Sequence, residues 1–337
     1  MLRKRRQFPG IPLLLMLASA NAAPLFENHS VLEVELAGPI TSVMQNDAGK
    51  SEHSFLLSTS DAQYDLAVRL RGNSRLRVCD FRPLRLRFLN EQPDKSDFAG
   101  QSKLKLVTHC RNNDRAEHNV LEEYLAYRIF NVLSDFSYRV RLLRIRYSDT
   151  DGKLKKSARH RYGFLIESSD ELAARMESSA AEVPGVSRNA LVPQQAALVY
   201  VFQYMIGNTD WSIVTADTDD HCCHNIDLYE AGSQYLPVPY DFDLAGLVSA
   251  SYAKPDPSLR LRNVKQRRYR GYCIPTEHLQ SALEQIVSGK PEVLAVLTDI
   301  TGLPDKQRRD AEKYIGRFFE EAAKPARLLQ KFERGCL

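Results

Sequence analysis

The sequence predicts an α+β protein of two lobes, a β-rich lobe followed by a mainly helical one. Apolar and charged residues alternate in several segments between residues 62 and 166, as in strands that have one buried face. One strong helical pattern interrupts these segments, and beyond Pro193 most of the chain reads as helices joined by short strands. We expect a signal peptide over residues 1–22, the β-rich lobe over 23–178 and the helical lobe over 179–337.

The first residues have the composition of a secretory signal peptide. Residues 4–6 are basic, residues 11–17 form an apolar core, and Ala20-Asn21-Ala22 fits a cleavage site. The apolar run is too short to span a bilayer comfortably, and no later stretch is long and apolar enough. We therefore expect a secreted or periplasmic protein with no transmembrane segment in the mature chain.

The overall charge is mild. The 46 basic and 42 acidic residues give a net charge of +4, which does not indicate a nucleic-acid binder. We accordingly expect no nucleic-acid partner, and we expect the protein to be a monomer.

An even number of cysteines in an exported chain favours disulfides. The six are Cys79, Cys110, Cys222, Cys223, Cys273 and Cys336. Cys79 and Cys110 both lie beside expected strands of one lobe, so their pairing is plausible. The adjacent residues Cys222 and Cys223 are each expected to need a distant partner, such as Cys273 and Cys336.

The run His221-Cys222-Cys223-His224 also contains the side chains that zinc prefers. Four consecutive residues cannot easily close a tetrahedron, however, and an oxidising compartment favours disulfides over thiolate ligands. We therefore favour disulfides over zinc here, and we expect His224 to orient the loop.

A tight turn lies between two expected strands of the first lobe. The strands span residues 62–70 and 84–88, and the turn is Arg71-Gly72-Asn73-Ser74. A glycine turn between two strands can bring backbone amides close to phosphate groups. A plain hairpin is the alternative interpretation. Further strands of this lobe are expected at about 31–36, 103–107, 139–147 and 160–166.

Two lysines and two glutamates follow that turn. Lys103 and Lys105 lie on one face of the expected strand 103–107, and Glu122 and Glu123 lie in the first turns of a helix that begins at Asn119. Protein kinases use a strand lysine and a helix glutamate to hold nucleotide phosphates. Solvated surface side chains are the simpler explanation for residues of these types.

The most informative stretch runs over residues 204–246, where an apolar helix is followed by Asp210, Asn225, Asp241 and Asp243. Protein kinases present a loop acid, an asparagine and a strand-end acid in this order. The first acid orients or accepts the proton of the nucleophile, and the other two hold a divalent metal ion. The same oxygen ligands would suit a calcium site or a metal-dependent hydrolase, and single acids often only cap turns.

The second lobe contains one strongly basic segment. Residues 260–270 include six Lys and Arg side chains, which we interpret as a solvated face or as a docking surface for an acidic substrate or the cell envelope. Trp211 is expected to pack in the core. Helices are expected at 196–206, 276–288, 290–297 and about 304–321, and paired strands at 226–229 and 235–240.

Several of these motifs together resemble the spore-coat-protein-H (CotH) kinase-like family. The resemblance covers about residues 66–246 and rests on VRLRGNSR, RPLRLRF, KLKLV, GNTDW, HNI and YDFDLAG. Members of that family are secreted or surface-exposed atypical kinases with a divergent protein-kinase-like fold of two lobes. The resemblance therefore implies a β-rich N-lobe with one long helix, and a mainly helical C-lobe that carries the catalytic motifs.

The resemblance also implies roles for individual residues. Asp210 matches the catalytic acid, Asn225 the metal-binding amide, and Asp241 or Asp243 the metal carboxylate. The implied cofactors are ATP with Mg²⁺ or Mn²⁺, and the implied activity is transfer of the γ-phosphoryl group to a hydroxyl of a protein substrate.

The chain departs from the family in its first strand pair, and this bears on phosphate binding. The family usually has lysines where this chain has Arg82, Arg85 and Arg87. Lys103 and Lys105 are then the candidate phosphate ligands, and Arg87 is a possible substitute. The turn at 71–74 is a further candidate. A pseudokinase-like scaffold of the cell envelope and a metal-dependent phosphohydrolase are the alternative functions.

Overall fold

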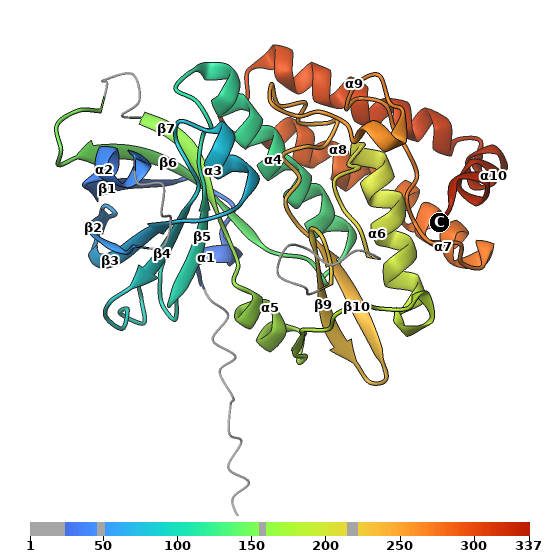
Figure 1. The fold of residues 1–337 in the computed structure, drawn as a ribbon, viewed down its shortest axis with the longest axis horizontal. Helices are drawn as coiled ribbons and strands as arrows, with labels where there is room; N and C mark the ends of the chain where they lie inside the picture. Colours follow the sequence, from blue (N-terminus) through green and yellow to red (C-terminus); the bar gives the residue numbers. More distant parts are fainter. Residues whose placement is uncertain (1–23, 46–50, 155–159, 214–221) are drawn as a thin grey trace, which may run out of the picture.

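The computed structural model describes residues 24–45, 51–154, 160–213 and 222–337. A β-rich N-terminal part and a mainly helical C-terminal part lie side by side, and α4 lies between them (Figure 1). The expected α+β class, with strands first and helices after, is confirmed. The expected signal peptide, residues 1–22, lies outside the described residues.

The N-terminal part is a closed barrel in the order β1-β2-β3-β4-β5-β7-β6. Neighbouring strands are antiparallel except at the closure, where β1 pairs with β6 in parallel. Alternate side chains fill the interior: Leu84, Leu86 and Phe88 of β4 are buried, whereas Arg85 and Arg87 point outward. The strands are β1 (Leu32–Gly38), β2 (His53–Ser58), β3 (Gln63–Leu70), β4 (Leu84–Phe88), β5 (Lys103–Val107), β6 (Val140–Asp149) and β7 (His160–Ile166).

Short helices accompany the barrel, and one of them replaces the hairpin considered above. α3 (Ser74–Val78) follows the 71–74 turn, and the chain reaches β4 only after it. A disulfide between Cys79 and Cys110 joins the end of α3 to the loop before α4, which confirms the expected pairing. The other short helices are α1 (Pro24–Glu27) and α2 (Ile40–Gln45).

The long helix α4 (Asp114–Leu133) begins five residues before the expected Asn119. Its start is fixed by Asn113, whose side chain accepts a hydrogen bond of 2.8 Å from the backbone of Ala116. The helix has no single apolar face, because it is covered by the barrel on one side and by α8 and other helical elements on the other. α4 is therefore the shared core of both parts.

The C-terminal part combines a small sheet with a group of helices. The sheet has the order β10-β9-β8, and α6 packs against β10 and α7. α10 was not expected, because the last predicted helix ends at about residue 321; Pro325 starts a new helix shortly after the end of α9. The elements are α5 (Ser169–Arg175), β8 (Ala180–Ala181), α6 (Pro193–Ile206), β9 (Ile226–Ala231), β10 (Gln234–Pro239), α7 (Thr276–Ser288), α8 (Lys290–Asp299), α9 (Asp305–Ala322) and α10 (Pro325–Gly335).

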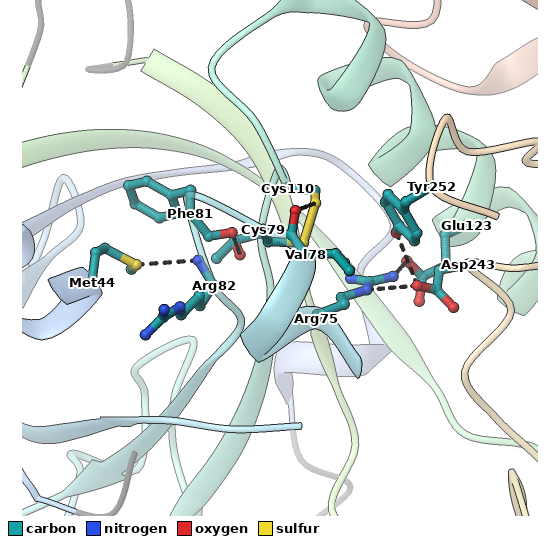
Figure 2. Close-up of a disulfide and its surroundings, with 11 residues drawn as sticks. Met44, Arg75, Val78, Cys79, Phe81, Arg82, Cys110, Glu123, Asp243 and Tyr252 are labelled. Atoms are coloured by element: carbon teal, nitrogen blue, oxygen red, sulfur yellow. Dashed lines mark hydrogen bonds and ion pairs between the residues drawn. A yellow bond between two sulfur atoms is a disulfide. The ribbon is translucent and has the colours of Figure 1, made fainter. Parts of the chain in front are cut away.

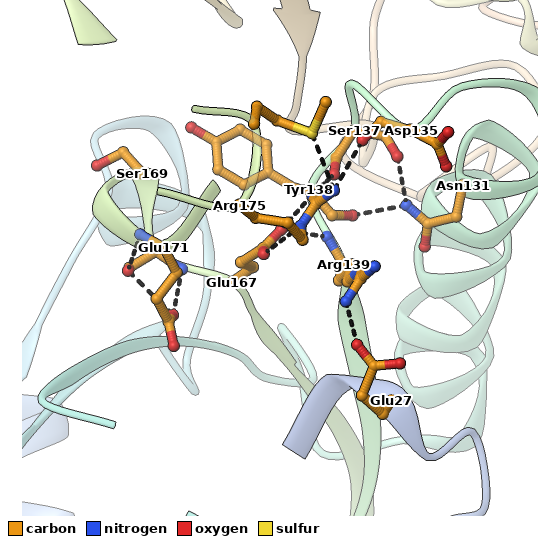
Figure 3. Close-up of polar contacts among 12 residues, drawn as sticks. Glu27, Asn131, Asp135, Ser137, Tyr138, Arg139, Glu167, Ser169, Glu171 and Arg175 are labelled. Atoms are coloured by element: carbon orange, nitrogen blue, oxygen red, sulfur yellow. Dashed lines mark hydrogen bonds and ion pairs between the residues drawn. The ribbon is translucent and has the colours of Figure 1, made fainter. Parts of the chain in front are cut away.

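A polar network fixes α5 to the barrel (Figure 3). Arg175 donates two hydrogen bonds of 2.9 Å to the carboxylate of Glu167, and it also donates to the backbone oxygens of Asp135 and Ser137. Ser168 and Glu171 form a capping box at the start of α5. The segment that leads into the second sheet is thus held against the end of the barrel.

The other cysteines pair differently from the expectation. Cys222 is bonded to its neighbour Cys223, and Cys273 is bonded to Cys336. The prediction that Cys222 and Cys223 would need distant partners was wrong, because α10 brings Cys336 back to Cys273. With both thiols in a disulfide, the zinc interpretation loses its two cysteine ligands. His221 lies outside the described residues.

We expect peptide mapping without reductant to find Cys222 and Cys223 on one peptide, lighter than its reduced form by two hydrogen atoms. The Cys273 and Cys336 peptides should migrate as one linked species that separates on reduction. A peptide that links Cys222 or Cys223 to either of these two residues would contradict the structure.

Within the described ranges, no helix is both long enough and apolar enough to cross a membrane.

Candidate functional site

Two glycines bring the Asp210 loop against the segment that follows β10. α6 ends at Gly207, whose φ of 66° is left-handed, and the backbone of Gly246 donates a 3.1 Å hydrogen bond to the Gly207 oxygen. A Cβ atom on Gly207 would lie 2.0 Å from the Tyr314 hydroxyl, and one on Gly246 would lie 2.4 Å from the same atom. A Cβ on Gly246 would also lie 2.5 Å from the backbone oxygen of Val264, and the left-handed φ of Gly207 favours glycine, so both positions suit this residue.

Asp210 is held by three neighbours. Its backbone nitrogen donates to Asn208 Oδ1 at 3.0 Å, and Asn225 Nδ2 donates to its carboxylate at 3.0 Å and to its backbone oxygen at 2.6 Å. His224 Nε2 lies 3.2 Å from the other carboxylate oxygen. The Asp210 side chain nevertheless remains 38% exposed, so one face of an oriented carboxylate is open to a ligand.

The open face of Asp210 borders a cavity of about 280 Å³. Two cations, Lys254 and Arg270, and the acid Asp256 also line this cavity. Trp211 is buried at 3% exposure and stacks on Tyr200, which confirms its expected place in the core. The cavity offers room for a small chemical group beside Asp210.

Asn225 is buried and has a φ of 55°, a left-handed conformation that asparagine tolerates better than most residues. Both hydrogen bonds to Asp210 use its amide nitrogen. Its carbonyl oxygen is therefore the atom that could bind a cation. Residue 225 also accepts a backbone hydrogen bond from Tyr240, which places it beside the start of the next acidic segment.

Asp241 also has a left-handed backbone, with a φ of 58°, and its nitrogen donates to the Tyr127 hydroxyl at 2.9 Å. Burial raises the pKa of Asp241 to about 6; the Asp243 carboxylate adds to the rise, and Arg75 and Arg71 oppose it. Asp210 contributes to the same rise, so the two acids are close enough to interact. Asp241 thus interacts electrostatically with the two arginines and with the Asp210 loop.

Asp243 has a different environment from Asp241. It is buried at 4% exposure and accepts hydrogen bonds from Arg75 Nε at 2.8 Å and from the Tyr252 hydroxyl at 2.9 Å (Figure 2). Arg75 Nη2 also donates a hydrogen bond to a carboxylate oxygen of Glu123 of α4. Burial by itself lowers the pKa of Arg75, but the two carboxylates raise it well above its usual value.

The two helix glutamates are therefore engaged elsewhere than expected. Glu123 pairs with Arg75, and Glu122 pairs with Arg115 at 3.3 Å and accepts a hydrogen bond from Asn119 at 2.9 Å. Burial raises the pKa of Glu122 to about 7 despite Arg115. Each of these glutamates is thus paired with an arginine and not with the strand lysine Lys105.

Lys105 lies between two aromatic rings. Its Nζ is 5.6 Å from the centre of the Tyr138 ring and 5.5 Å from that of Tyr240. Burial lowers the pKa of Lys105, and Asp227 of β9 opposes this most strongly. Asp227 accepts a hydrogen bond from the Tyr138 hydroxyl, and burial raises its pKa. The electrostatic partner of Lys105 is thus an acid of the small sheet.

One pocket between the two parts gathers most of the predicted phosphate-binding residues. Residues 71–74, Lys105 and Glu123 line it together with Asp241. Burial lowers the pKa of Arg71, and Asp241 opposes this effect. Its other lining residues include Arg75, Tyr127, Tyr138 and Tyr240.

Three predicted residues do not line that pocket. Arg87 makes an ion pair with Glu52 on the outside of the barrel, Lys103 is exposed beside it in the neighbouring strand, and Glu122 faces Arg115. Position along a strand explains the difference, because Arg87 and Lys103 lie at the far end of β4 and β5 from the 71–74 turn.

The oxygen donors suit an open magnesium or manganese site, in which the protein supplies few ligands, better than a site enclosed by protein ligands. In the part of the chain that is described, no three His, Cys, Asp or Glu side chains are grouped so as to hold a metal ion. Asp241 and the Asn225 carbonyl oxygen offer two hard ligands. Magnesium sites in phosphoryl-transfer proteins commonly have only one or two protein ligands, with substrate phosphates and water as the others.

Comparison with known proteins gives a distant structural similarity. No protein-family model and no curated protein matches the chain. The crystal structure of a Helicobacter pylori proinflammatory kinase, CtkA, is similar over 82% of this chain and 93% of that chain, with 10% sequence identity and a TM-score of 0.35. These comparisons do not name the spore-coat-protein-H family, so membership of that family stays a prediction.

Proposed function

We propose that this protein is an exported atypical kinase that transfers the γ-phosphoryl group of ATP to a hydroxyl of a protein substrate with the help of Mg²⁺ or Mn²⁺. One observation carries the proposal: Arg71, Lys105 and Asp241 line a single pocket, and Asp210, which borders a second cavity, is joined to the Asp241 segment through the hydrogen bonds of Asn225. Cations for phosphate, hard oxygen ligands for a metal and a carboxylate for the acceptor are the parts that phosphoryl transfer requires.

Each group of residues has a separate role in this proposal. Arg71 and Lys105 neutralise phosphate oxygens, and the glycine turn at 71–74 brings its backbone amides near them. Asp241 and Asn225 hold the metal ion, which would offset the charge of the phosphates when bound. Asp210 accepts a hydrogen bond from the acceptor hydroxyl in the 280 Å³ cavity and takes its proton as the phosphoryl group leaves the nucleotide.

Two features favour the alternative of a pseudokinase-like scaffold. Glu123 is paired with Arg75 and not with Lys105, and the pocket between the two parts holds only about 30 Å³ of space for water-sized molecules. A nucleotide therefore requires the two parts to separate. If they do not, the site remains a set of buried ion pairs.

We expect ATP with Mn²⁺ to raise the melting temperature of the protein, because a ligand at a hundred times its Kd stabilises the folded state by about 2.7 kcal/mol. Lys105→Ala and Arg71→Ala should each reduce this rise. Arg87→Ala, which removes an equal charge from the outside of the barrel, should not. The measurement is a thermal-shift titration of all four proteins.

The absence of any shift in the folded wild-type protein at millimolar nucleotide would favour the scaffold. If Arg87→Ala loses the shift and Lys105→Ala keeps it, the assignment of the phosphate site is wrong. Incubation with labelled ATP then separates a kinase from a phosphohydrolase, since the first labels protein and the second releases only phosphate.

A further inference from the structure

Residues of α9 and α10 line a basic groove. These helices lie at the end of the molecule farthest from the barrel (Figure 1). The groove encloses about 840 Å³. Six cationic side chains and two carboxylates line it, an excess of four charges that equals the net charge of the whole chain. The cations of this α9–α10 groove are Arg268, Arg317, Lys324, Arg327, Lys331 and Arg334.

Most of these cations have no carboxylate to neutralise them. Lys331 is paired with Glu321 at 3.0 Å, and Glu321 also accepts a 2.6 Å hydrogen bond from the Tyr204 hydroxyl. The remaining lining acid, Glu320, is exposed. Within the described part of the chain, no ion pair within 4.0 Å involves the exposed side chains of Arg317, Lys324, Arg327 or Arg334.

The fold fixes the direction in which this charge points. α10 buries Leu328, Leu329 and Phe332 in the core, so its opposite face must turn to solvent. Positions 327, 331 and 334 are spaced by three or four residues and therefore form one stripe along the helix, and Lys324 immediately precedes it. The Cys273–Cys336 disulfide holds the end of the helix in place. Like charges along one stripe repel one another, and a bound polyanion would relieve that repulsion.

We propose that the α9–α10 groove binds an acidic segment of a partner protein. A concave groove admits an extended chain more readily than the flat surface of a bilayer, and its guanidinium groups can form paired hydrogen bonds with carboxylates. None of its lining residues is aromatic, so it offers no surface on which nucleobases could stack.

The groove also lies near the acceptor side of the candidate active site. Arg268 lines the groove, and Arg270, two residues later, lines the Asp210 cavity and donates a hydrogen bond to the Thr209 oxygen. A protein whose acidic segment occupies the groove would have neighbouring residues within reach of that cavity. This link to an acceptor substrate rests on the proposed function, whereas binding of the acidic segment does not.

The test is fluorescence anisotropy with a labelled peptide of alternating glutamate and glycine, and with a matched peptide in which glutamine replaces glutamate. The glutamate peptide should bind, and the Arg327→Glu, Arg334→Glu double variant should weaken binding by at least about tenfold, since it removes two attractions and adds two repulsions. Binding should also fall as salt approaches about 0.5 M.

The matched control is Arg309→Glu with Lys313→Glu, which makes the same charge change on exposed residues of α9 outside the groove. It should keep the wild-type affinity, and melting curves should show that both variants are folded. Equal binding of the glutamine peptide, or an unchanged Kd in the groove variant, would overturn the proposal. The proposal would also be overturned if the protein does not bind the glutamate peptide but binds phosphatidylglycerol vesicles, and if the groove variant loses this vesicle binding.

No nucleotide or turnover enters this assay, so its failure leaves the phosphoryl-transfer proposal standing. Conversely, peptide binding by a protein that does not bind ATP would support the groove and contradict the proposed kinase activity.

Discussion

Arg75→Met is expected to lower the free energy of unfolding by about 3–5 kcal/mol, because it leaves two buried carboxylates without their cation. The Arg75, Glu123 and Asp243 side chains are 9%, 3% and 5% exposed, so water cannot replace the lost ion pairs. Methionine keeps most of the apolar volume of the arginine stem, which separates the loss of charge from the loss of packing. Urea denaturation at neutral pH measures the difference.

The matched control is Arg77→Met, which removes an exposed arginine from the same short helix and should change stability by less than about 0.5 kcal/mol. A triple variant that adds Glu123→Gln and Asp243→Asn to Arg75→Met should recover much of the loss, because it removes the unpaired charges. If Arg75→Met is as stable as Arg77→Met, the buried triad does not hold the two parts together.

The sequence could not have singled out Arg75. Seven arginines occur between residues 69 and 87, and nothing local distinguishes the one that is buried. Its partners are 48 and 168 residues away along the chain, so only the packing of α4 and of the segment after β10 identifies it. Local alternation was enough to predict β4 and β5, because the side-chain period of two is visible within five residues.

The candidate site was predictable to a similar extent. The order of Asp210, Asn225 and Asp241 is a local signal, and the structure brings the three residues close to one another. The different environments of Asp241 and Asp243 were not predictable, since they depend on which of the two carboxylates pairs with Arg75. Asp227 was missed because it occupies an ordinary position in an expected strand, and its contacts depend on Tyr138, which lies just before β6.

Strand β2 and the vicinal disulfide were missed for different reasons. The strand follows a polar turn and has only a short alternating pattern over residues 53–58. The disulfide was missed because neighbouring cysteines were assumed to be unable to bond to each other. In both cases the contacts that form the feature arise only when the chain is folded, so the local sequence does not reveal them.

Asp210→Asn is expected to cut phosphoryl transfer by about a hundredfold to ten-thousandfold, which is the usual contribution of a positioned general base. The amide at position 210 can still accept a hydrogen bond from Asn225, so the loop should keep its conformation. Binding of ATP with Mn²⁺, measured by thermal shift, should therefore remain close to wild type. The rate is measured as incorporation of labelled phosphate.

Substitutions of the other two acids should give different results, and the contrast tests the assignment. Asp241→Asn should weaken metal-dependent nucleotide binding, because Asp241 lines the pocket with Arg71 and Lys105. Asp243→Asn should mainly reduce stability, because its carboxylate is held by Arg75 and Tyr252. Full phosphate incorporation by Asp210→Asn protein would mean that Asp210 is not the base. A loss of nucleotide binding in Asp243→Asn, with Asp241→Asn unaffected, would reverse the roles of the two acids.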